Sequence, residues 1–457
     1  MINARMCHPE RAQRVEGSPA QDRSSHMRWG FLAALGMTLL TTSLFAQSVV
    51  INNPGTKGTF AIRNATIVPV TSAPIANGTI VFANGVITAI GPNMSVPAGA
   101  TVIDGTGLSV YPGLIDSGCT VGLTEIDSVA GTVDTAEIGD VNPNARADVA
   151  LNPHSNLIPV TRLNGITAVV SEPQGGLVSG QSALIQLAGW TPKEMTIKAP
   201  LALQIRFPRL RSGALEEQPQ EEEEKEATKT YRDELEKLRE LFRDARAYAK
   251  SSSVKAHRYD RDVVLEAMVP YAEGRLPVVI HANIERDIRA AIKFADDEKI
   301  KMILADAQDA PRVIGELKSH NIPVILGPIL QIPQREDDPY DYIFTAPKTL
   351  YDAGIRFAIQ SSDSHNTRNL PYHAGAAAAF GLPKDVALKA VTIFPAEIYG
   401  VADKIGSLEV GKVANIILTD GDPLEIRTNV KRVFINGEDI PMESNQTLLY
   451  KKFSQRP

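Results

Sequence analysis

The residues of this chain that could carry chemistry are polar side chains that follow apolar runs in its central part. His281 and Asp306 each directly follow such a run, and Asp363 lies three residues beyond another one. A buried imidazole or carboxylate is costly unless it is paired or bound to a metal ion. We therefore expect these side chains to pair or to hold a cation, although His281 by itself is also compatible with an ordinary hydrogen-bonded core histidine. The other polar residues in such positions are Asp116 to Thr120, Ser171, Glu172, Asn283, Ser361, Ser362, Ser364 and His365.

These side chains need a scaffold that brings several strand ends together. Between residues 112 and 403, strand-like runs alternate with helical patterns, which is typical of a parallel α/β architecture. Eight such runs fit a (β/α)8 barrel of the TIM type, in which reactive groups lie at the carboxyl ends of the strands. The runs are 112–116, 166–170, 182–187, 201–207, 277–281, 301–305, 322–326 and 356–360.

Both ends of the chain predict short strands joined by tight turns. Asn84–Gly85 lies between β-rich runs near one end, and Asn436–Gly437 has the same kind of position near the other. An Asn-Gly pair in this setting is a strong hairpin signal, because both turn residues need a positive φ. Neither group of strands alone can bury a sheet face. We therefore expect residues 58–111 and 404–440 to form one small β-sandwich domain beside the barrel of residues 112–403.

The first 46 residues are predicted to be a leader rather than part of the fold. Arg28 precedes an apolar run from Gly30 to Leu40, and small and polar residues follow it. This is the order of a secretory signal, which we place at residues 27–46, with Met27 as the start of translation. We therefore expect an exported protein, periplasmic or secreted, and an uncleaved anchor is the alternative.

The composition bears on the partners of the chain. The 457 residues are 43% hydrophobic and 22% charged, and the net charge of −6 is spread along the sequence. Without a basic patch there is no signal for nucleic acid or a membrane surface. We expect the chain to bind a small-molecule substrate and no nucleic acid, and not to insert stably in a membrane once the signal is removed. A homo-oligomer is compatible with the sequence. Cys119 has no disulfide partner if Cys7 leaves with the leader, and a small buried hydrophobe is favoured over a nucleophile for it.

Three motifs resemble the amidohydrolase superfamily. Residues 112–116 (PGLID) are similar to its first-strand motif, and residues 406–415 (GSLEVGKVAN) are similar to its return into the β-domain. Residues 392–396 (TIFPA), followed by Gly400, match the helix before that return. The nearest likeness is to exported, imidazolonepropionase-like members. The resemblance implies a (β/α)8 barrel beside a β-sandwich made from both chain ends, and hydrolysis of an amide or other C–N bond by metal-activated water.

The metal ligands that this resemblance implies are only partly present. The His-x-His pair of the family falls on Gly118 and Thr120, and neither residue can replace an imidazole on zinc. Carried over residue by residue, the resemblance implies His281 and Asp363 as ligands, with Asp306 as a third group. These three would hold a divalent cation, zinc or manganese, in a degenerate metal site.

The resemblance also implies roles around that cation. Asp363 would be the general base that takes a proton from the water, and Asn283, His365 and Arg368 are predicted to bind the substrate. Arg368 would make a bidentate contact with a carboxylate, although a loop in which it satisfies backbone groups fits equally well. Glu172 and His365 are alternatives for the third ligand. We predict a hydrolase acting on a non-peptide C–N bond, amide or cyclic amide, of a small molecule; the alternative is a barrel without catalysis that serves as a ligand-binding or partner subunit.

Overall fold

The computed structural model describes residues 55–209, 221–252 and 261–456. The chain divides into two compact units, Met1–Val49 and Val50–Pro457. The first unit, with the predicted signal and Cys7, lies outside the described residues, and the described fold is that of the second unit. Among the helices in the described ranges, none is both long and apolar enough to cross a membrane.

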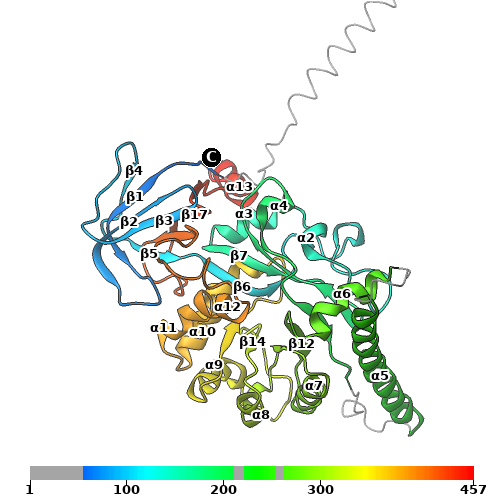
Figure 1. The fold of residues 1–457 in the computed structure, drawn as a ribbon. Helices are drawn as coiled ribbons and strands as arrows, with labels where there is room; N and C mark the ends of the chain where they lie inside the picture. Colours follow the sequence, from blue (N-terminus) through cyan, green and yellow to red (C-terminus); the bar gives the residue numbers. More distant parts are fainter. Residues whose placement is uncertain (1–54, 210–220, 253–260, 457) are drawn as a thin grey trace, which may run out of the picture. The chain divides into compact units, whose positions relative to one another are not determined.

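One sheet is built from both ends of the chain (Figure 1). Its strands run in the order β18-β17-β16-β5-β1-β2-β3, and β4 pairs with β1. The antiparallel pairing of β5 with β16 joins the two ends, with Tyr111 opposite Ile417. The strands form one hydrogen-bonded path, so the predicted two-sheet sandwich is not confirmed. They are β1 (Phe60–Ile67), β2 (Ile75–Ala83), β3 (Val86–Pro92), β4 (Thr101–Asp104), β5 (Ser109–Pro112), β16 (Ile416–Thr419), β17 (Val430–Ile435) and β18 (Glu438–Ile440).

The turns and the core of this sheet follow from its sequence. Asn84–Gly85 and Asn436–Gly437 have a positive φ at both residues, which confirms the two predicted hairpin turns. The rings of Phe60, Phe82 and Phe434 pack together with centroids 4.9 to 5.5 Å apart. Full burial of such a ring stabilises by roughly 1.5–3 kcal/mol, so these aromatic contacts tie the first strands to the last ones.

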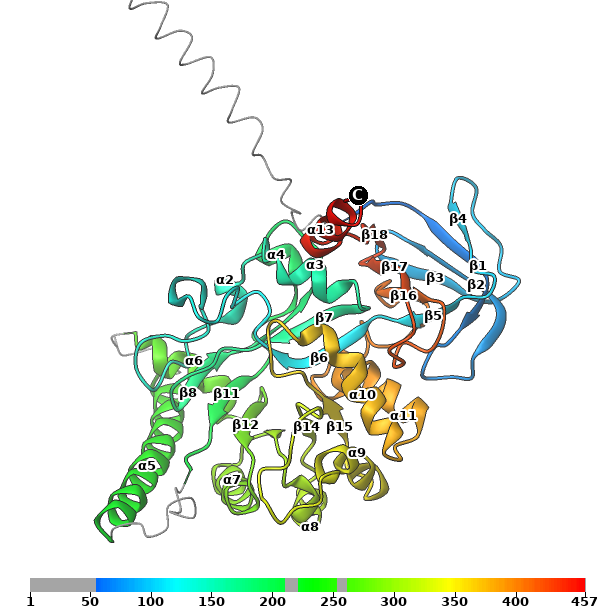
Figure 2. The same ribbon diagram turned by 180° about the vertical axis from the view of Figure 1, so that it is seen from behind.

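The middle of the chain forms two further sheets (Figures 1 and 2). Strands β11 to β15 are parallel neighbours in chain order, and β8 pairs antiparallel with β11. In the other sheet β6 is parallel to β7, β9 is antiparallel to β7, and β10 is antiparallel to β9. The strands are β6 (Leu114–Cys119), β7 (Ile166–Ser171), β8 (Val178–Gln181), β9 (Ala183–Gln186), β10 (Thr196–Lys198), β11 (Leu203–Arg206), β12 (Val278–Ala282), β13 (Met302–Asp306), β14 (Val324–Leu326) and β15 (Phe357–Ile359).

The predicted third strand, 182–187, departs from the (β/α)8 pattern. It corresponds to β9, which is antiparallel rather than parallel to β7, and the strand just before it, β8, belongs to the other sheet. The chain changes sheets close to Gly180, which has a φ of +131°. A Cβ at this position would lie 2.8 Å from the carbonyl oxygen of Ala145, so this passage requires glycine.

The sheets also do not close on each other between β15 and β6. The backbone N–H of Ile359 donates to the carbonyl of Ala390 at 3.0 Å, and that of Ile115 donates to the carbonyl of Val391 at 2.8 Å. The segment at residues 390–391 therefore takes up hydrogen bonds that a direct ladder would use. The closed barrel of the prediction is corrected to a barrel-like pair of open sheets.

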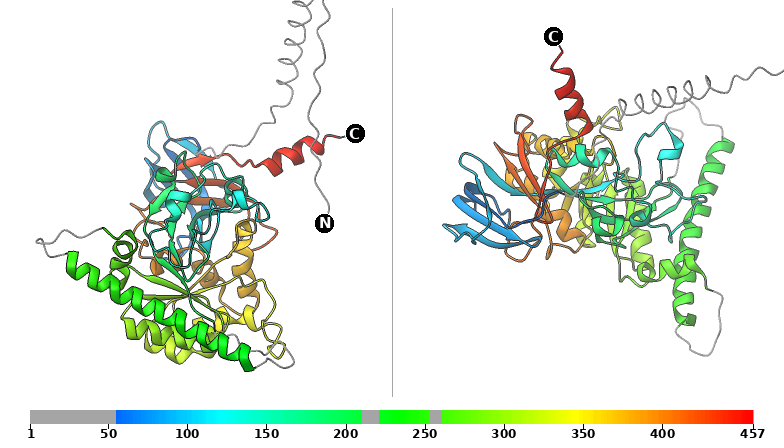
Figure 3. Two further views of the ribbon diagram at one scale, coloured as in Figure 1. Left: turned by 90° about the vertical axis from the view of Figure 1, so that its right-hand side faces the viewer. Right: turned by 90° about the horizontal axis from the view of Figure 1, so that it is seen from above.

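Helices cover these sheets. The longest, α5, is the long green helix in Figure 3. It buries Phe242 edge-on against Phe294 of α7, with ring centroids 5.8 Å apart. The helices are α2 (Ala147–Ala150), α3 (Leu157–Arg162), α4 (Pro192–Met195), α5 (Glu221–Ser252), α6 (Val263–Ala272), α7 (Glu285–Glu298), α8 (Ile314–Ser319), α9 (Tyr342–Asp352), α10 (Leu370–Ala379), α11 (Lys384–Lys389), α12 (Ile393–Ile398) and α13 (Asn445–Phe453), with 3-10 turns η1 (Ala130–Thr132), η2 (Ala310–Arg312) and η3 (Thr367–Asn369).

Candidate active site

Polar side chains from the barrel strands and their carboxyl ends meet inside the barrel-like part. His281 at the end of β12 bonds to Asp306 at the end of β13, as the sequence predicts for a shared site, and also to Gln204 of β11. Glu172, which follows β7, is close enough that the charges of His281 and Asp306 both act on it. Apart from Asp306, the members of this group are buried. We call it the central polar cluster: Asp116, Glu172, Gln204, His281, Asp306 and Gln360.

Both ring nitrogens of His281 have hydrogen-bond partners. Nε2 lies 2.9 Å from Oε1 of Gln204, and Nδ1 lies 3.2 Å from Oδ2 of Asp306. The second carboxylate oxygen of Asp306 accepts a hydrogen bond from Nε2 of Gln360 at 3.0 Å. An amide, an imidazole, a carboxylate and a second amide thus form one continuous chain across β11, β12, β13 and the end of β15.

The direction of these hydrogen bonds determines the protons on the ring. Ser182 Oγ donates to the carbonyl of Ala202 at 3.2 Å, so it accepts from Nε2 of Gln204 at 2.9 Å. With this orientation Gln204 presents its carbonyl oxygen to Nε2 of His281, while Nδ1 faces the carboxylate of Asp306. This arrangement favours the protonated ring, in which neither nitrogen has a lone pair for a metal ion.

The charges of the pair agree with this assignment. Burial disfavours the charged ring, but the charge of Asp306 and its hydrogen bond outweigh burial and raise the pKa of His281. Burial likewise opposes the charge of Asp306, but the charge and hydrogen bond of His281 outweigh it and lower the pKa of that carboxyl. Asp306 and Ala307 have φ of 67° and 49°, in the left-handed region that non-glycine residues seldom adopt. Such strained backbone is often found at functional sites.

Two further carboxyl groups in the cluster are buried, and no Lys or Arg side chain of the described ranges pairs with either of them. Burial raises the pKa of Glu172 to about 7, against the opposing charge of His281. Burial also raises the pKa of Asp116 to about 7, although its Oδ1 accepts hydrogen bonds from the backbone N–H of Gly118 and of Ser361, each at 3.1 Å. A carboxyl that titrates near neutral pH can both take up and release a proton, which is the property of a general acid or base.

The raised pKa of Asp116 predicts how stability depends on pH. The folded chain holds a proton on this group between its ordinary pKa of 3.8 and about 7, where the unfolded chain has lost it. The stability that this proton provides is fully present below about pH 4 and is lost as the pH rises through 7. We expect Asp116→Asn to remove this loss, which is on the order of 4 kcal/mol, measured by urea unfolding at several pH values. An unchanged slope in the variant would contradict the raised pKa.

The residues at the family's metal positions do not fit a metal ion. A Cβ on Gly118 would lie 2.3 Å from Oε1 of Gln360 and 3.1 Å from Oε2 of Glu172, so these two side chains fill the place of the missing imidazole. Within the described ranges, no group of three or more His, Cys, Asp or Glu side chains could hold a metal ion. The predicted set of His281, Asp306 and Asp363 is therefore not assembled, because the first two bond to each other and the third has other partners.

Asp363 caps the loop that follows β15. Its Oδ1 accepts from the backbone N–H of His365 at 2.7 Å and of Asn366 at 3.1 Å, and its Oδ2 accepts from Nδ2 of Asn366 at 3.0 Å. Burial alone would raise its pKa, but these hydrogen bonds outweigh burial and lower it. A carboxylate held in this way is a weak base, so the geometry gives the predicted catalytic role of Asp363 no support.

The three predicted substrate-binding residues lie on loops at the strand ends. Oδ1 of Asn283 accepts from the backbone N–H of Gln308 at 3.4 Å. Nδ1 of His365 lies 3.5 Å from a carboxylate oxygen of Asp127. Nη1 of Arg368 donates to the carbonyl of His365 at 2.8 Å, which is the backbone-satisfying alternative considered for it. Their role in substrate binding stays a prediction.

Sequence reasoning missed the two glutamines that complete the cluster. Gln204 lies in the apolar run LALQIRF, and Gln360 ends the run RFAIQ. Amides inside strands that are otherwise apolar were the available signal, since a buried amide needs partners. The run LALQIRF also places Arg206 two residues after Gln204, on the same face of the strand.

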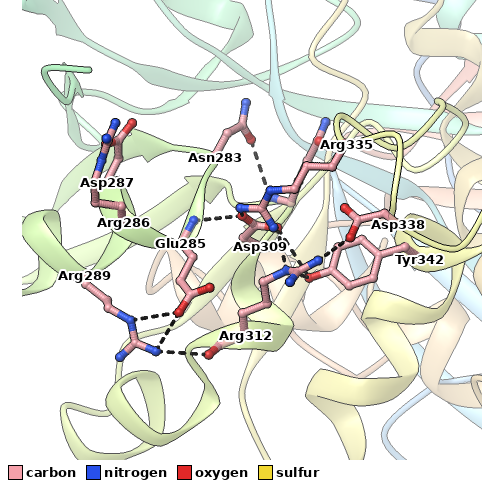
Figure 4. Close-up of polar contacts among 11 residues, drawn as sticks. Asn283, Glu285, Arg286, Asp287, Arg289, Asp309, Arg312, Arg335, Asp338 and Tyr342 are labelled. Atoms are coloured by element: carbon pink, nitrogen blue, oxygen red, sulfur yellow. Dashed lines mark hydrogen bonds and ion pairs between the residues drawn. The ribbon is translucent and has the colours of Figure 1, made fainter. Parts of the chain in front are cut away.

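A second polar cluster lies on the loops after β13 and β14 (Figure 4). Asp309 is buried, and its carboxylate accepts from Nε of Arg312 at 3.1 Å and from Nη2 of Arg335 at 2.7 Å. It also accepts from the backbone N–H of Glu285 at 2.8 Å. Arg312 pairs in addition with Asp338 and lies over a tyrosine ring. These contacts hold residues 327–341 against the loop after β13.

We expect Asp309→Ala to destabilise the protein by roughly 2 kcal/mol, because it removes an acceptor of several charge-assisted hydrogen bonds. Hydrogen exchange of the loop 327–341 should also become faster, since Arg335 loses its anchor. Asp352→Ala is the matched control, because its ion pair with Lys348 is on the surface; its effect should stay within about 0.5 kcal/mol. Equal effects of the two substitutions would contradict the role of Asp309.

Comparison with known proteins identifies the family. Residues 183–440, more than half of the chain, match the amidohydrolase family. The chain therefore belongs to this family, whose members usually use divalent metal ions. It is 24% identical over 391 residues to amidohydrolase tasK of Hapsidospora irregularis, an alignment that covers 79% of this chain and 39% of that protein. The chain thus spans well under two thirds of that relative.

Solved structures support the class of fold. An amidohydrolase from Thermotoga maritima MSB8 is similar with a TM-score of 0.74 and 24% identity, over 83% of this chain and 99% of that one. A molinate hydrolase is similar with a TM-score of 0.52 and 15% identity, over 85% and 95% of the two chains. Likeness at these identities concerns the fold alone, which is an α/β fold like the TIM barrel.

Proposed function

We propose that this protein hydrolyses a non-peptide C–N bond, in an amide or cyclic amide, of a small molecule, and that the carboxyl group of Glu172 moves the proton. The observation that carries the proposal is this carboxyl: it is buried at the end of β7, has a pKa of about 7 and is beside the ion pair of His281 and Asp306. We place the proton transfer on Glu172 rather than Asp363, because the pKa of Asp363 is lowered.

The proposed reaction has two proton transfers on one residue. Glu172, as a carboxylate, takes a proton from water while the water oxygen attacks the carbonyl carbon. The negative charge that forms on the carbonyl oxygen is stabilised by the positive charge of His281, which the ion pair with Asp306 keeps in place. Glu172 then gives its proton to the leaving nitrogen as the C–N bond breaks. The products are a carboxylic acid and an amine, and Glu172 returns to its starting state.

The family resemblance implies metal-activated water. Two observations speak for a reaction without it: a Cβ at Gly118 would meet the Gln360 side chain, and both ring nitrogens of His281 have other partners. No step of the proposed reaction therefore passes through a metal ion. In this proposal the imidazolium of His281 supplies positive charge inside the barrel. The family membership supports hydrolysis as the class of reaction.

A second candidate is a ligand-binding subunit without catalysis. The observation that favours it is the bonding of His281 on both ring nitrogens, together with glycine at position 118. In this case the central polar cluster would be a recognition surface whose carboxyl groups bind a ligand and transfer no proton.

A substrate panel distinguishes the two candidates. Purified protein is assayed with linear amides, cyclic amides, ureas and dipeptides, with amine release as the readout, and binding of each compound is followed by thermal shift. The hydrolase proposal expects amine release from at least one class, and it fails if compounds bind but none is hydrolysed. That result would leave the binding subunit as the function.

We also propose that the protein belongs to the exported, imidazolonepropionase-like branch of the family and acts after export. The support is the signal-like order of residues 27–46, which lie outside the described residues, and the motif at 406–415. N-terminal sequencing of the protein from its native compartment tests this. A mature chain that still begins at Met27 or earlier would contradict signal cleavage.

A further inference from the structure

Arg206 places a positive charge at the edge of the central polar cluster. It is the last residue of β11 and is in register with His281 on the neighbouring strand β12. Gln204 precedes it by two residues, so both side chains leave the same face of the strand, and Gln204 contacts the ring of His281. The Arg206 side chain is therefore directed to the side of the sheet on which the cluster lies, one step closer to the strand ends.

Within the described ranges, the Arg206 guanidinium lacks the partners that other arginines of the barrel have. Among the residues that the structure describes, none forms a hydrogen bond or an ion pair with the side chain of Arg206. Arg206 is nevertheless partly buried. By contrast, Arg312 and Arg335 pair with Asp309, and Arg368 donates to a backbone carbonyl.

The carboxylates near Arg206 do not take the place of a partner. Its charge acts on Glu172 and on Asp306. The two oxygens of Asp306, however, already accept from His281 and Gln360. Glu172 makes no ion pair with it, and as the proposed base it must exchange protons. A partly buried guanidinium in this position is best satisfied by an anion that arrives from outside.

We propose that the substrate of this site carries a carboxylate group and that Arg206 binds it. The planar fork of a guanidinium matches the two oxygens of a carboxylate, which allows a bidentate contact. Bound in this way, the substrate would have its C–N bond close to Glu172, on the neighbouring side of the cluster. The inference rests on the proposed function for its site, and it adds the substrate class: N-acyl amino acids and related amides with an acidic group.

The test measures binding, so it does not depend on turnover. N-acetylglycine and its neutral analogue N-acetylglycinamide are titrated into the full chain by calorimetry, with inorganic phosphate as a third probe. We expect N-acetylglycine to bind at least roughly tenfold more tightly than the other two, because a charge-assisted pair is worth more than a neutral contact. Arg206→Gln should weaken its binding on the order of 10- to 100-fold, whereas Arg206→Lys should restore part of it.

Arg275→Gln is the matched control, because Arg275 pairs with Glu273 on the surface, before the start of β12 and away from the cluster. Its affinity for N-acetylglycine should stay within about twofold of that of the unmodified chain. The inference is overturned if the acid binds no better than the amide or phosphate, or if the preference survives Arg206→Gln. If the preference depends on Arg206 but no compound is hydrolysed, the proposed hydrolase function fails and the assignment of the ligand stands.

Discussion

Glu172→Gln is expected to lower the rate of C–N hydrolysis by on the order of 10²- to 10⁴-fold, the usual contribution of a general base. The substitution keeps the size of the side chain and removes the group that accepts the proton. Because the pKa of Glu172 is about 7, kcat/KM of the unmodified protein should rise as the pH rises through neutrality, as the base ionises. The variant should lose this dependence. The measurement is the pH profile of amine release from the best compound of the panel.

Asp363→Asn is the matched control for Glu172→Gln. Asparagine keeps a side-chain oxygen that can accept from the backbone N–H groups of His365 and Asn366, so the loop should hold its fold. We expect its rate to stay within about tenfold of the unmodified protein, since Asp363 is not the base in this reaction. If Asp363→Asn abolishes hydrolysis while Glu172→Gln does not, the base is Asp363, as the family resemblance implies, and the assignment of Glu172 is wrong.

Gly118→His is expected to destabilise the protein by roughly 3 kcal/mol, because it forces a large side chain into a filled interior. Its Cβ alone would lie 2.3 Å from Oε1 of Gln360, a buried oxygen. The change restores the first histidine of the family's pair but finds no space for the ring. We therefore also expect that it does not create zinc binding, measured by metal analysis after dialysis, alongside urea unfolding.

Gly131→His is the control for this substitution. A Cβ at Gly131 meets nothing within 4 Å, so the same histidine there should change stability by no more than about 0.5 kcal/mol. Adding Gln360→Ala to Gly118→His should recover part of the lost stability, since it removes the side chain that causes the clash. A Gly118→His variant that is as stable as the unmodified chain and binds zinc would show that the cluster is a metal site.

The features of the fold that could be predicted are those that depend on neighbouring residues in the sequence. The hairpins at Asn84–Gly85 and Asn436–Gly437 follow from the φ that each turn requires, and the parallel strands of the barrel follow from their apolar runs. The direction of β8 and β9 could not be predicted in this way. A short apolar run is the same in a parallel and an antiparallel strand, and the choice in this chain depends on a close approach between Gly180 and Ala145 in space.

The candidate site was also predictable only in part. His281 and Asp306 were expected to share a site because the ends of parallel neighbouring strands meet, and they do bond to each other. The resemblance implies instead that this pair binds a metal ion together with Asp363. The observed site differs from that metal centre because the amides of Gln204 and Gln360 bond to the ring and to the carboxylate. Their positions in the sequence do not indicate this role. Hydrogen-bond direction is a property of the folded chain.

Metal dependence tests most directly whether proton transfer by Glu172 replaces metal-activated water in this protein. The rate of hydrolysis is measured before and after exhaustive treatment with a chelator, and the metal content is determined on the same samples. We expect the treated protein to retain its full rate with no zinc or manganese bound. Loss of activity on chelation, with recovery on adding zinc or manganese, would contradict a metal-independent reaction at Glu172.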